Sequence, residues 1–374
     1  MNIMETSALL KEYVDYVEKS QTRKVVLFGA GANAASLIVN HFIFNAVEFI
    51  CDNDEKKHGK KMLGVSICSP EKLLDNPENF VVIITPKAPL LFKQIQEQCI
   101  AMKLPYVYDN YILSLITRVE TYDSPWCNSF HSINFYQEIC KNNDKIQSVR
   151  SILCDEKSSQ IYDAFIFKMK YSLGDYSDIC DSGEEYFLDD IFSYTDKEIF
   201  VDGGSYNGDD TIRYFKKLGS KFKRAYCFEP DDSNYSNTRD ALATTFGDGK
   251  TVKLFKSGLS NKAGSMNFLA LGTDGSRYVD EPGETKIVKL DDIVDKEDTI
   301  TFIKLDIEGA ELSALEGMKN IIQRDKPKLA ICIYHKLADL WEIPLYIKEL
   351  VPEYKIFVRH HWHGIFGKIL YATT

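Results

Sequence analysis

The first third of the chain alternates short apolar runs with segments of helical spacing. The apolar runs cover residues 24–28, 47–51 and 80–84, and each is followed by a glycine, an aspartate or a Thr-Pro pair that ends a strand. Short apolar runs bounded in this way predict buried strands, and strands that alternate with helical segments predict a parallel sheet. We therefore expect residues 1–115 to form a small Rossmann-like α/β domain.

The last half of the chain repeats this alternation. Its apolar runs lie at residues 198–202, 224–228, 301–305, 328–334, 354–359 and 368–372. Only a turn separates the last two runs, which predicts an antiparallel hairpin at the end of an otherwise parallel sheet. We expect residues 198–374 to form a doubly wound α/β domain that ends in this hairpin.

Two further segments predict helices. Residues 1–20 place Leu9, Leu10, Tyr13, Val14 and Val17 on one helical face, and they lack the compact apolar core of a signal peptide. Residues 116–197 are polar, with helical spacing at 158–171 behind the capping residues Asp155 and Ser158. We expect 116–197 to be a helical connector. It is either a lid over the following domain, with Tyr186 and Phe187 as walls, or a plain linker.

Composition narrows the class of protein. A chain of 374 residues exceeds the ~250–300 residues at which one core stops growing, which agrees with two domains. The net charge of −10, from 45 basic and 55 acidic residues, argues against a general nucleic-acid surface. No apolar run approaches the ~18 residues of a membrane span. The nine cysteines include no Cys-x-x-Cys pair, which favours reduced thiols in a cytoplasmic protein without a metal site.

The strongest candidate site is a glycine loop that follows the run at 198–202. Its spacing is Asp202-x-Gly204-x-x-x-Gly208, and the next strand ends on Glu229. Glycines let the backbone approach a ligand closely, and an acid at the end of the next strand accepts both hydroxyls of a ribose. Asp306 and Glu308, after the strand at 301–305, and His335, after the strand at 328–334, are expected at the same edge of the sheet, because ligands bind outside the carboxyl ends of parallel strands.

These motifs resemble the FkbM-type O-methyltransferases, which depend on S-adenosylmethionine (SAM). The matching segments are residues 201–209, 228–230, 303–311, 330–336 and 339–344, within a resemblance that covers roughly residues 150–374. Ser205 and Asp210 depart from the family's usual alanine and threonine or serine, and Gly367-Lys368 stands where relatives often carry Glu-Thr. The resemblance implies SAM as cofactor and a class I methyltransferase fold. It also implies methyl transfer to a hydroxyl of a sugar, glycan precursor or other small molecule.

Together, the motifs and the resemblance assign roles to individual residues. The predicted cofactor-binding residues are Asp202, Gly203, Gly204, Ser205, Asn207, Gly208, Glu229 and Asp306. His335 is the candidate general base, because its ordinary pKa suits neutral pH. The alternative for His335 is a structural hydrogen bond to a backbone carbonyl. Asp306 or Glu308 orients that base or contacts the cofactor's amino group, with a divalent ion held by these two carboxylates as a further alternative. Glu311 is expected to stabilise the first turn of its own helix through the helix dipole.

A second cluster of histidines, at His360, His361 and His363, lies in the turn of the final hairpin. Adjacent residues on a strand point to opposite faces, so these histidines do not all reach one ion without a bend in the chain. We expect a surface turn, with a loop that contacts substrate as the alternative.

The N-terminal domain carries its own fingerprint, Gly29-x-Gly31-x-x-Ala34, with Asp52 about twenty residues further on. This pattern is typical of dinucleotide binding. Two alternatives to the methyltransferase hypothesis follow. One is an oxidoreductase that uses NAD or a nucleotide sugar at this domain, and the other is a binding protein without catalysis. The glycines are also explained by tight strand–helix packing in a docking scaffold.

Overall fold

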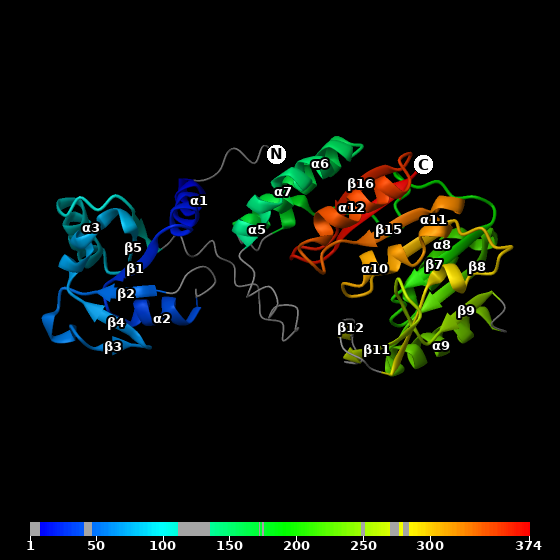
Figure 1. Cartoon of the computed structure of the whole chain (residues 1–374), viewed down its shortest axis with the longest axis horizontal. Coiled ribbons are helices and arrows are strands. Elements are labelled where there is room, and N and C mark those ends of the chain that lie inside the picture. The colour runs from blue at the N-terminus through cyan, green and yellow to red at the C-terminus, as the bar shows by residue number, and fades with distance from the viewer. Residues whose placement is uncertain are drawn as a thin grey trace. The chain divides into compact units, whose positions relative to one another are not determined.

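The computed structural model describes residues 8–40, 47–110, 135–171, 173, 176–247, 251–269, 277–279 and 284–374 (Figure 1). The chain divides into two compact units, which are described separately. The N-terminal unit comprises Met1–Glu138 with Phe167–Gly174, and the C-terminal unit comprises Ile139–Ile166 with Asp175–Thr374. The predicted boundary near residue 115 lies outside the described residues, so the three-part division stays a prediction.

The N-terminal unit contains a six-stranded sheet in the order β3-β4-β2-β1-β5-β6. Its strands are β1 (Lys24–Phe28), β2 (Val47–Cys51), β3 (Lys61–Met62), β4 (Val65–Cys68), β5 (Phe80–Ile84) and β6 (Val107–Asp109). All pairs are parallel except β3 with β4. The three strands predicted from the sequence are β1, β2 and β5, with the predicted bounds.

Helices cover both faces of this sheet. They are α1 (Ala8–Ser20), α2 (Ala32–Asn40) and α3 (Pro89–Ala101). Val25 and Leu27 point to the face that α1 and α2 cover, whereas Val26 and Phe28 point to the face under α3. This alternation is the two-residue period of a strand that is buried on both faces. The predicted helical face of residues 1–20 is the one that packs on the sheet.

The C-terminal unit contains a seven-stranded sheet in the order β16-β17-β15-β14-β7-β8-β9. Its strands are β7 (Glu198–Gly203), β8 (Phe222–Phe228), β9 (Val252–Phe255), β14 (Phe302–Leu305), β15 (Lys328–Cys332), β16 (Lys355–His360) and β17 (Lys368–Thr373). Only β17 runs antiparallel to its neighbours, between β15 and β16. The predicted doubly wound sheet with a terminal antiparallel hairpin is confirmed.

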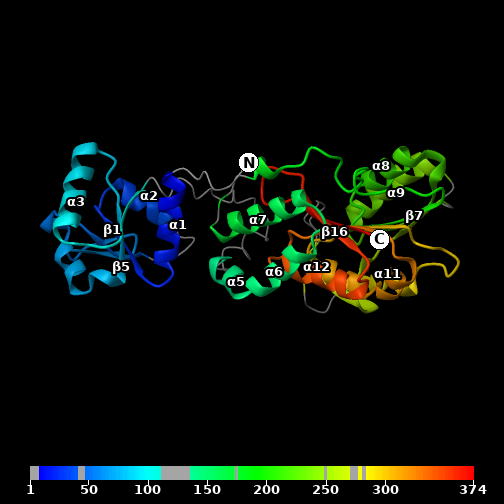
Figure 2. The ribbon, with the colours of Figure 1, turned by 90° about the horizontal axis from the view of Figure 1, so that it is seen from above.

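Helices pack on both faces of this sheet as well, with α8 and α9 on one side and α11 and α12 on the other (Figure 2). The helices in and beside this unit are α5 (Phe135–Lys141), α6 (Asn143–Ile152), α7 (Glu156–Lys170), α8 (Asp209–Leu218), α9 (Asp232–Phe246), α10 (Glu311–Glu316), α11 (Lys319–Asp325) and α12 (Asp339–Leu350). The predicted helix at 158–171 is α7, and the Asp155 carboxylate accepts the Ser158 N–H at 2.7 Å, as a cap should.

A small second sheet lies between β9 and β14 along the chain, in the order β10-β13-β11-β12. Its strands are β10 (Gly258–Leu259), β11 (Gly264–Leu269), β12 (Arg277–Val279) and β13 (Thr285–Val288). The sequence did not predict it, because its strands are short and carry many polar residues. Within the described ranges, every helix is too short or too polar to cross a lipid bilayer.

Candidate active site

The glycine loop joins β7 to α8 and forms one wall of a cavity in the C-terminal unit. Gly204 has φ of +78°, and a Cβ built on it would lie 1.8 Å from the carbonyl oxygen of Asp306. Only glycine fits this close approach of two backbones. Gly208 precedes the helix with φ of +84°. The N–H groups of Gly204 and Ser205 both donate to the Phe228 carbonyl at 3.1 Å, so the loop is fixed to the end of β8.

Glu229, the acid after β8, is held beside this loop. Its carboxylate accepts the backbone N–H of Tyr206 and that of Asp231, each at 2.9 Å. Burial raises the pKa of Glu229 to about 7, although these two hydrogen bonds act in the opposite direction. The side chain still borders the cavity, and an ionised carboxylate has acceptor positions left for ligand hydroxyls.

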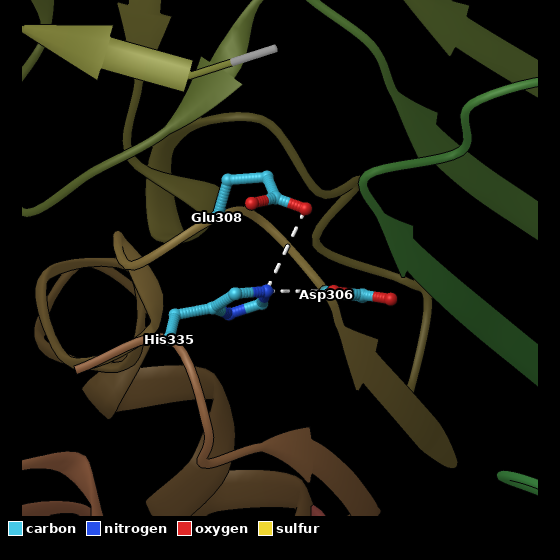
Figure 3. Close-up of side chains that lie close together, drawn as sticks. All are labelled: Asp306, Glu308 and His335. Atoms are coloured by element: carbon cyan, nitrogen blue, oxygen red, sulfur yellow. Dashed lines mark ion pairs between the residues drawn. The ribbon is translucent and has the colours of Figure 1, made fainter. Parts of the chain in front are cut away.

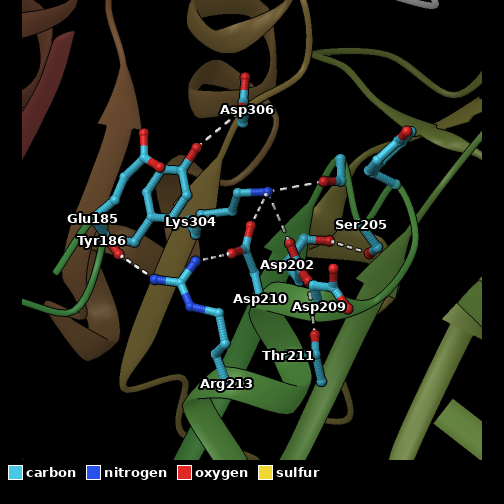
Figure 4. A network of polar contacts seen from close by, with 12 residues as sticks. Glu185, Tyr186, Asp202, Ser205, Asp209, Asp210, Thr211, Arg213, Lys304 and Asp306 are labelled. Carbon is cyan, nitrogen blue, oxygen red and sulfur yellow. Dashed lines mark hydrogen bonds and ion pairs between the residues drawn. The ribbon is translucent and has the colours of Figure 1, made fainter. Parts of the chain in front are cut away.

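Lys304 lies at the centre of a buried network below the loop (Figure 4). Its ammonium contacts the carboxylates of Asp202 and Asp210, both at 3.2 Å, and donates to the Gly204 carbonyl at 2.8 Å. Burial disfavours a charged lysine, but the two aspartates outweigh burial, and the pKa of Lys304 lies well above its ordinary value. The lysine therefore stays charged and fixes the shape of the glycine loop.

Three side chains converge at the ends of β14 and β15 (Figure 3). Nε2 of His335 lies 3.4 Å from Asp306 and 3.6 Å from Glu308, whereas its Nδ1 lies 2.8 Å from Glu311. The hydroxyls of Tyr186 and Tyr334 donate to Asp306, at 2.8 and 3.2 Å. The predicted proximity of Asp306, Glu308 and His335 is thus present.

The electrostatics of this cluster bear on the predicted base. Burial lowers the pKa of His335, but the carboxylates of Glu311 and Glu308 outweigh burial and place the pKa well above its ordinary value. A histidine in this state keeps its proton at neutral pH while the surrounding charge is unchanged. The role of His335 as a base stays a prediction.

The cavity has a volume of about 450 Å³ and brings most of the predicted residues together. Gly204, Ser205, Asn207, Glu229, Asp306 and Glu308 line it. Asp202 and Gly203 end β7, and Gly208 precedes α8. His335 is buried next to Asp306 and Glu308. The cofactor and catalytic roles of these residues stay predictions.

Sequence reasoning missed several residues of the site. Lys304 was part of a recognised motif but had no role. The signal for it was a lysine inside the apolar strand β14, since lysine is almost never fully buried unless paired. Glu311 does begin α10, and it accepts the Ile307 N–H, but it also holds His335. Glu185, Arg213 and Trp362 border the cavity from distant segments and left no signal in the sequence.

The prediction of a surface turn for the histidines of the hairpin was wrong for His360. This residue ends β16, is fully buried and packs against the rings of Phe165 and Tyr176. Burial and the nearby Lys368 lower the pKa of His360 to about 3, so it stays neutral. The neighbouring Trp362 borders the cavity, which agrees with the alternative of a loop that contacts substrate.

In the N-terminal fingerprint, the acid Asp52 is bonded to residues of the same unit. The carboxylate of Asp52 accepts the Ala30 N–H at 2.6 Å and the Asp54 N–H at 2.8 Å, and it pairs with Lys57 at 2.9 Å. A dinucleotide site uses the equivalent acid to bind ribose. Here that carboxylate holds the glycine loop and pairs with a lysine, and ligand binding at this loop stays a prediction.

The sheet order, the glycine loop and the acid after β8 together define a class I methyltransferase fold. Residues 202–355 match the family described as Methyltransferase FkbM domain, and residues 3–102 match the family described as C-methyltransferase C-terminal domain. The resemblance drawn from the sequence is therefore confirmed as a match of residues 202–355 to the FkbM methyltransferase domain, and the protein is a methyltransferase.

Several solved structures are similar to this chain, and the first of them supports the fold. A methyltransferase FkbM from Methylobacillus flagellatus KT matches 98% of this chain and 99% of its own, with 21% identity and a TM-score of 0.57. An rRNA methylase from Streptococcus thermophilus matches 48% of this chain and 87% of its own, with 19% identity and a TM-score of 0.32. A SAM-dependent methyltransferase from Aquifex aeolicus matches 48% and 84%, with 15% identity and a TM-score of 0.29. No curated protein sequence matches the chain.

Proposed function

We propose that this protein binds SAM in the cavity of the C-terminal unit and transfers its methyl group to a hydroxyl of a sugar, glycan precursor or other small molecule. The observation that carries the proposal is the placement of the glycine loop and the Glu229 carboxylate on the wall of one cavity. The loop offers backbone to the ligand, and the carboxylate offers acceptors for the two ribose hydroxyls.

The charge of the cavity fits a cationic cofactor. Six acidic residues border it, against the two basic residues Arg213 and Lys304. The acidic residues are Glu185, Asp209, Asp210, Glu229, Asp306 and Glu308. SAM supplies an electrophilic methyl group on a positively charged sulfur, and a negative wall attracts that charge. The same wall opposes an anionic acceptor such as a free phosphate ester, which favours neutral or cationic sugars.

The protein's part in the reaction is to position the acceptor and to help remove its proton. Methyl transfer is an in-line displacement, so the acceptor oxygen has to lie close to the methyl carbon on the side away from sulfur. We assign this end of the cavity to the cluster of Asp306, Glu308 and His335. Trp362, which is 61% exposed, also borders the cavity, and its ring offers an apolar face to a sugar.

A second candidate is methyl transfer to carbon. The match of residues 3–102 to a C-methyltransferase C-terminal domain favours it. In that family's description the domain is C-terminal, whereas in this chain it precedes the methyltransferase domain. A nucleotide or nucleotide sugar at the N-terminal unit, and a cytoplasmic location, stay predictions.

Incubation of the full chain with SAM carrying a ¹³C-methyl group tests the proposal. The acceptors are a panel of neutral sugars, amino sugars and nucleotide sugars, and ¹³C NMR separates O-methyl from C-methyl products by chemical shift. We expect an O-methyl product with wild type and none with Glu229→Ala. A C-methyl product would replace the proposal by the second candidate, and no transfer to any acceptor class would contradict both.

A further inference from the structure

Two strand ends bring three metal-binding groups together in the C-terminal unit. Asp306 and Glu308 follow β14, and His335 follows β15. Their side chains point toward one another (Figure 3). One ligand atom from each of the three lies within 4.8 Å of the other two. Glu308 and Asp306 also border the cavity, so a group held between them faces the space assigned to the acceptor.

We propose that Asp306, Glu308 and His335 bind a divalent cation, Mn²⁺ or Mg²⁺, and that this cation holds the acceptor hydroxyl. The assignment to the acceptor rests on the proposed function, whereas the cation site itself rests on the geometry of the three side chains. Two carboxylates and one imidazole suit these cations, because carboxylate and water oxygens are the ligands they prefer and imidazole is tolerated by Mn²⁺.

The spacing of the donor atoms fits a shared cation. Donors about 2.1 Å from an octahedral ion lie about 3.0 Å apart when adjacent and about 4.2 Å apart when opposite. His335 Nε2 lies 3.4 Å from Asp306 Oδ1 and 3.6 Å from Glu308 Oε1, between these two limits. The three ligand atoms lie within 4.8 Å of one another, so binding of one ion to all three requires the side chains to move closer together.

Neighbouring residues hold the proposed ligands in place. Glu311 contacts the opposite ring nitrogen of His335, which leaves Nε2 directed at the two carboxylates. The tyrosine hydroxyls of Tyr186 and Tyr334 fix the Asp306 carboxylate. Histidines that bind metals almost always donate their other ring N–H to a carboxylate or carbonyl, and ligating carboxylates are hydrogen-bonded in turn. Both arrangements are present here.

A cation at this position would activate the acceptor hydroxyl for methyl transfer. A hydroxyl beside a divalent cation loses its proton more readily, because the cation stabilises the oxygen's negative charge. The O–H bond breaks and the proton passes to water in the cavity. The oxygen's electron pair then forms the bond to the methyl carbon, while the carbon–sulfur bond breaks and its electron pair returns to sulfur.

To test the site, Mn²⁺ is titrated into full-length protein that has been treated with EDTA. Binding is measured by electron paramagnetic resonance and by calorimetry. We expect one Mn²⁺ per chain in wild type, displaced by excess Mg²⁺, and binding at least about tenfold weaker in Glu308→Gln and in Asp306→Asn. Glu297→Gln is the matched control, because Glu297 is exposed and precedes β14, whereas Asp306 and Glu308 follow that strand, and we expect wild-type Mn²⁺ binding from it.

SAM binding, measured on the same samples, keeps the two proposals distinct. Absence of stoichiometric Mn²⁺ binding, or equal binding in wild type and both ligand variants, would overturn the cation site even if SAM binds normally. Mn²⁺ binding by wild type without any SAM binding would support the cation site and contradict the proposed cofactor.

Discussion

The carboxylate of Glu229 accepts the backbone N–H of Tyr206 at 2.9 Å, so the end of β8 is tied to the glycine loop that follows β7. One side chain therefore shapes the loop and also faces the cavity. The first prediction follows from its protonation.

The affinity for SAM should depend on pH through Glu229. Its pKa is raised to about 7 by burial, so the carboxylate is ionised above this pH and protonated below it. Only the ionised form accepts both ribose hydroxyls, and SAM affinity should therefore fall as the pH drops from 8 to 6. Glu229→Gln should bind SAM about tenfold more weakly at pH 8, since a hydrogen bond to a charged group contributes roughly 1.5–3 kcal/mol. The variant should lose this pH dependence, and calorimetry at several pH values measures both effects.

Gly204 should tolerate alanine much less well than another glycine with positive φ. Gly204 and Gly247 have φ of +78° and +73°, but only at Gly204 would a Cβ meet backbone, 1.8 Å from the Asp306 carbonyl oxygen. We expect Gly247→Ala to cost about 1–3 kcal/mol of unfolding free energy from backbone strain alone. Gly204→Ala should cost more and should also abolish SAM binding. Urea denaturation compares the two, and equal losses would show that the backbones separate easily.

Substitution of two buried lysines should distinguish a residue needed for SAM binding from one needed only for stability. Lys304 pairs with Asp202 below the glycine loop, and Lys328 pairs with Glu198 at 2.9 Å, at the start of β15. Methionine at either position leaves a buried carboxylate without its partner, which costs about 3–5 kcal/mol. Both variants should lose stability, but only Lys304→Met should weaken SAM binding under conditions where both remain folded. SAM binding that is equally reduced in Lys328→Met would argue against a specific role for Lys304.

Asp52 should stabilise the N-terminal unit in a manner that depends on pH. Burial raises its pKa, but the hydrogen bonds from Lys57, Asp54 and Ala30 outweigh burial and lower it. An acid whose pKa is lowered in the folded state stabilises that state fully at pH values above its unfolded pKa of about 4. This stabilisation is lost as the pH falls from about 4 through the lower pKa of the folded state. Asp52→Asn should destabilise by about 1–3 kcal/mol at pH 7, and the difference from wild type should shrink below pH 4.

Hydrogen exchange of the amides in β1 and β2 measures this local effect. Glu48→Gln is the control, because Glu48 forms only an exposed pair with Lys24, and such pairs contribute little. If the amides of β1 and β2 exchange as slowly in Asp52→Asn as in wild type, the carboxylate does not stabilise these strands, which contradicts the prediction.

The sequence predicted the regular strands well because their signals are local. The runs that became β1, β2, β5, β7 and β14 are mainly apolar, and each is followed by a glycine, an acid or a Thr-Pro pair that ends it. The predicted run at 328–334 became β15, which ends two residues earlier, at Cys332. Tyr334 is apolar enough to extend the pattern, but it turns its hydroxyl to Asp306 instead of pairing in the sheet.

The parts that the sequence did not reveal depend on contacts between distant segments. His335 and Glu311 are separated by 24 residues, and their contact follows from the adjacency of β14 and β15. Tyr186 reaches Asp306 across 120 residues from an irregular segment. No local periodicity encodes such pairs. The sequence therefore supplied the candidate residues at the strand ends, whereas the structure shows which of them touch.

The most direct measurement is calorimetric titration of SAM, and separately of NAD, into wild type, Glu229→Ala and Asp52→Ala. The account predicts that SAM binds wild type and Asp52→Ala with equal affinity and that Glu229→Ala loses this binding. NAD binding that is lost in Asp52→Ala, with no SAM binding by wild type, would contradict the account and place the active site in the N-terminal unit.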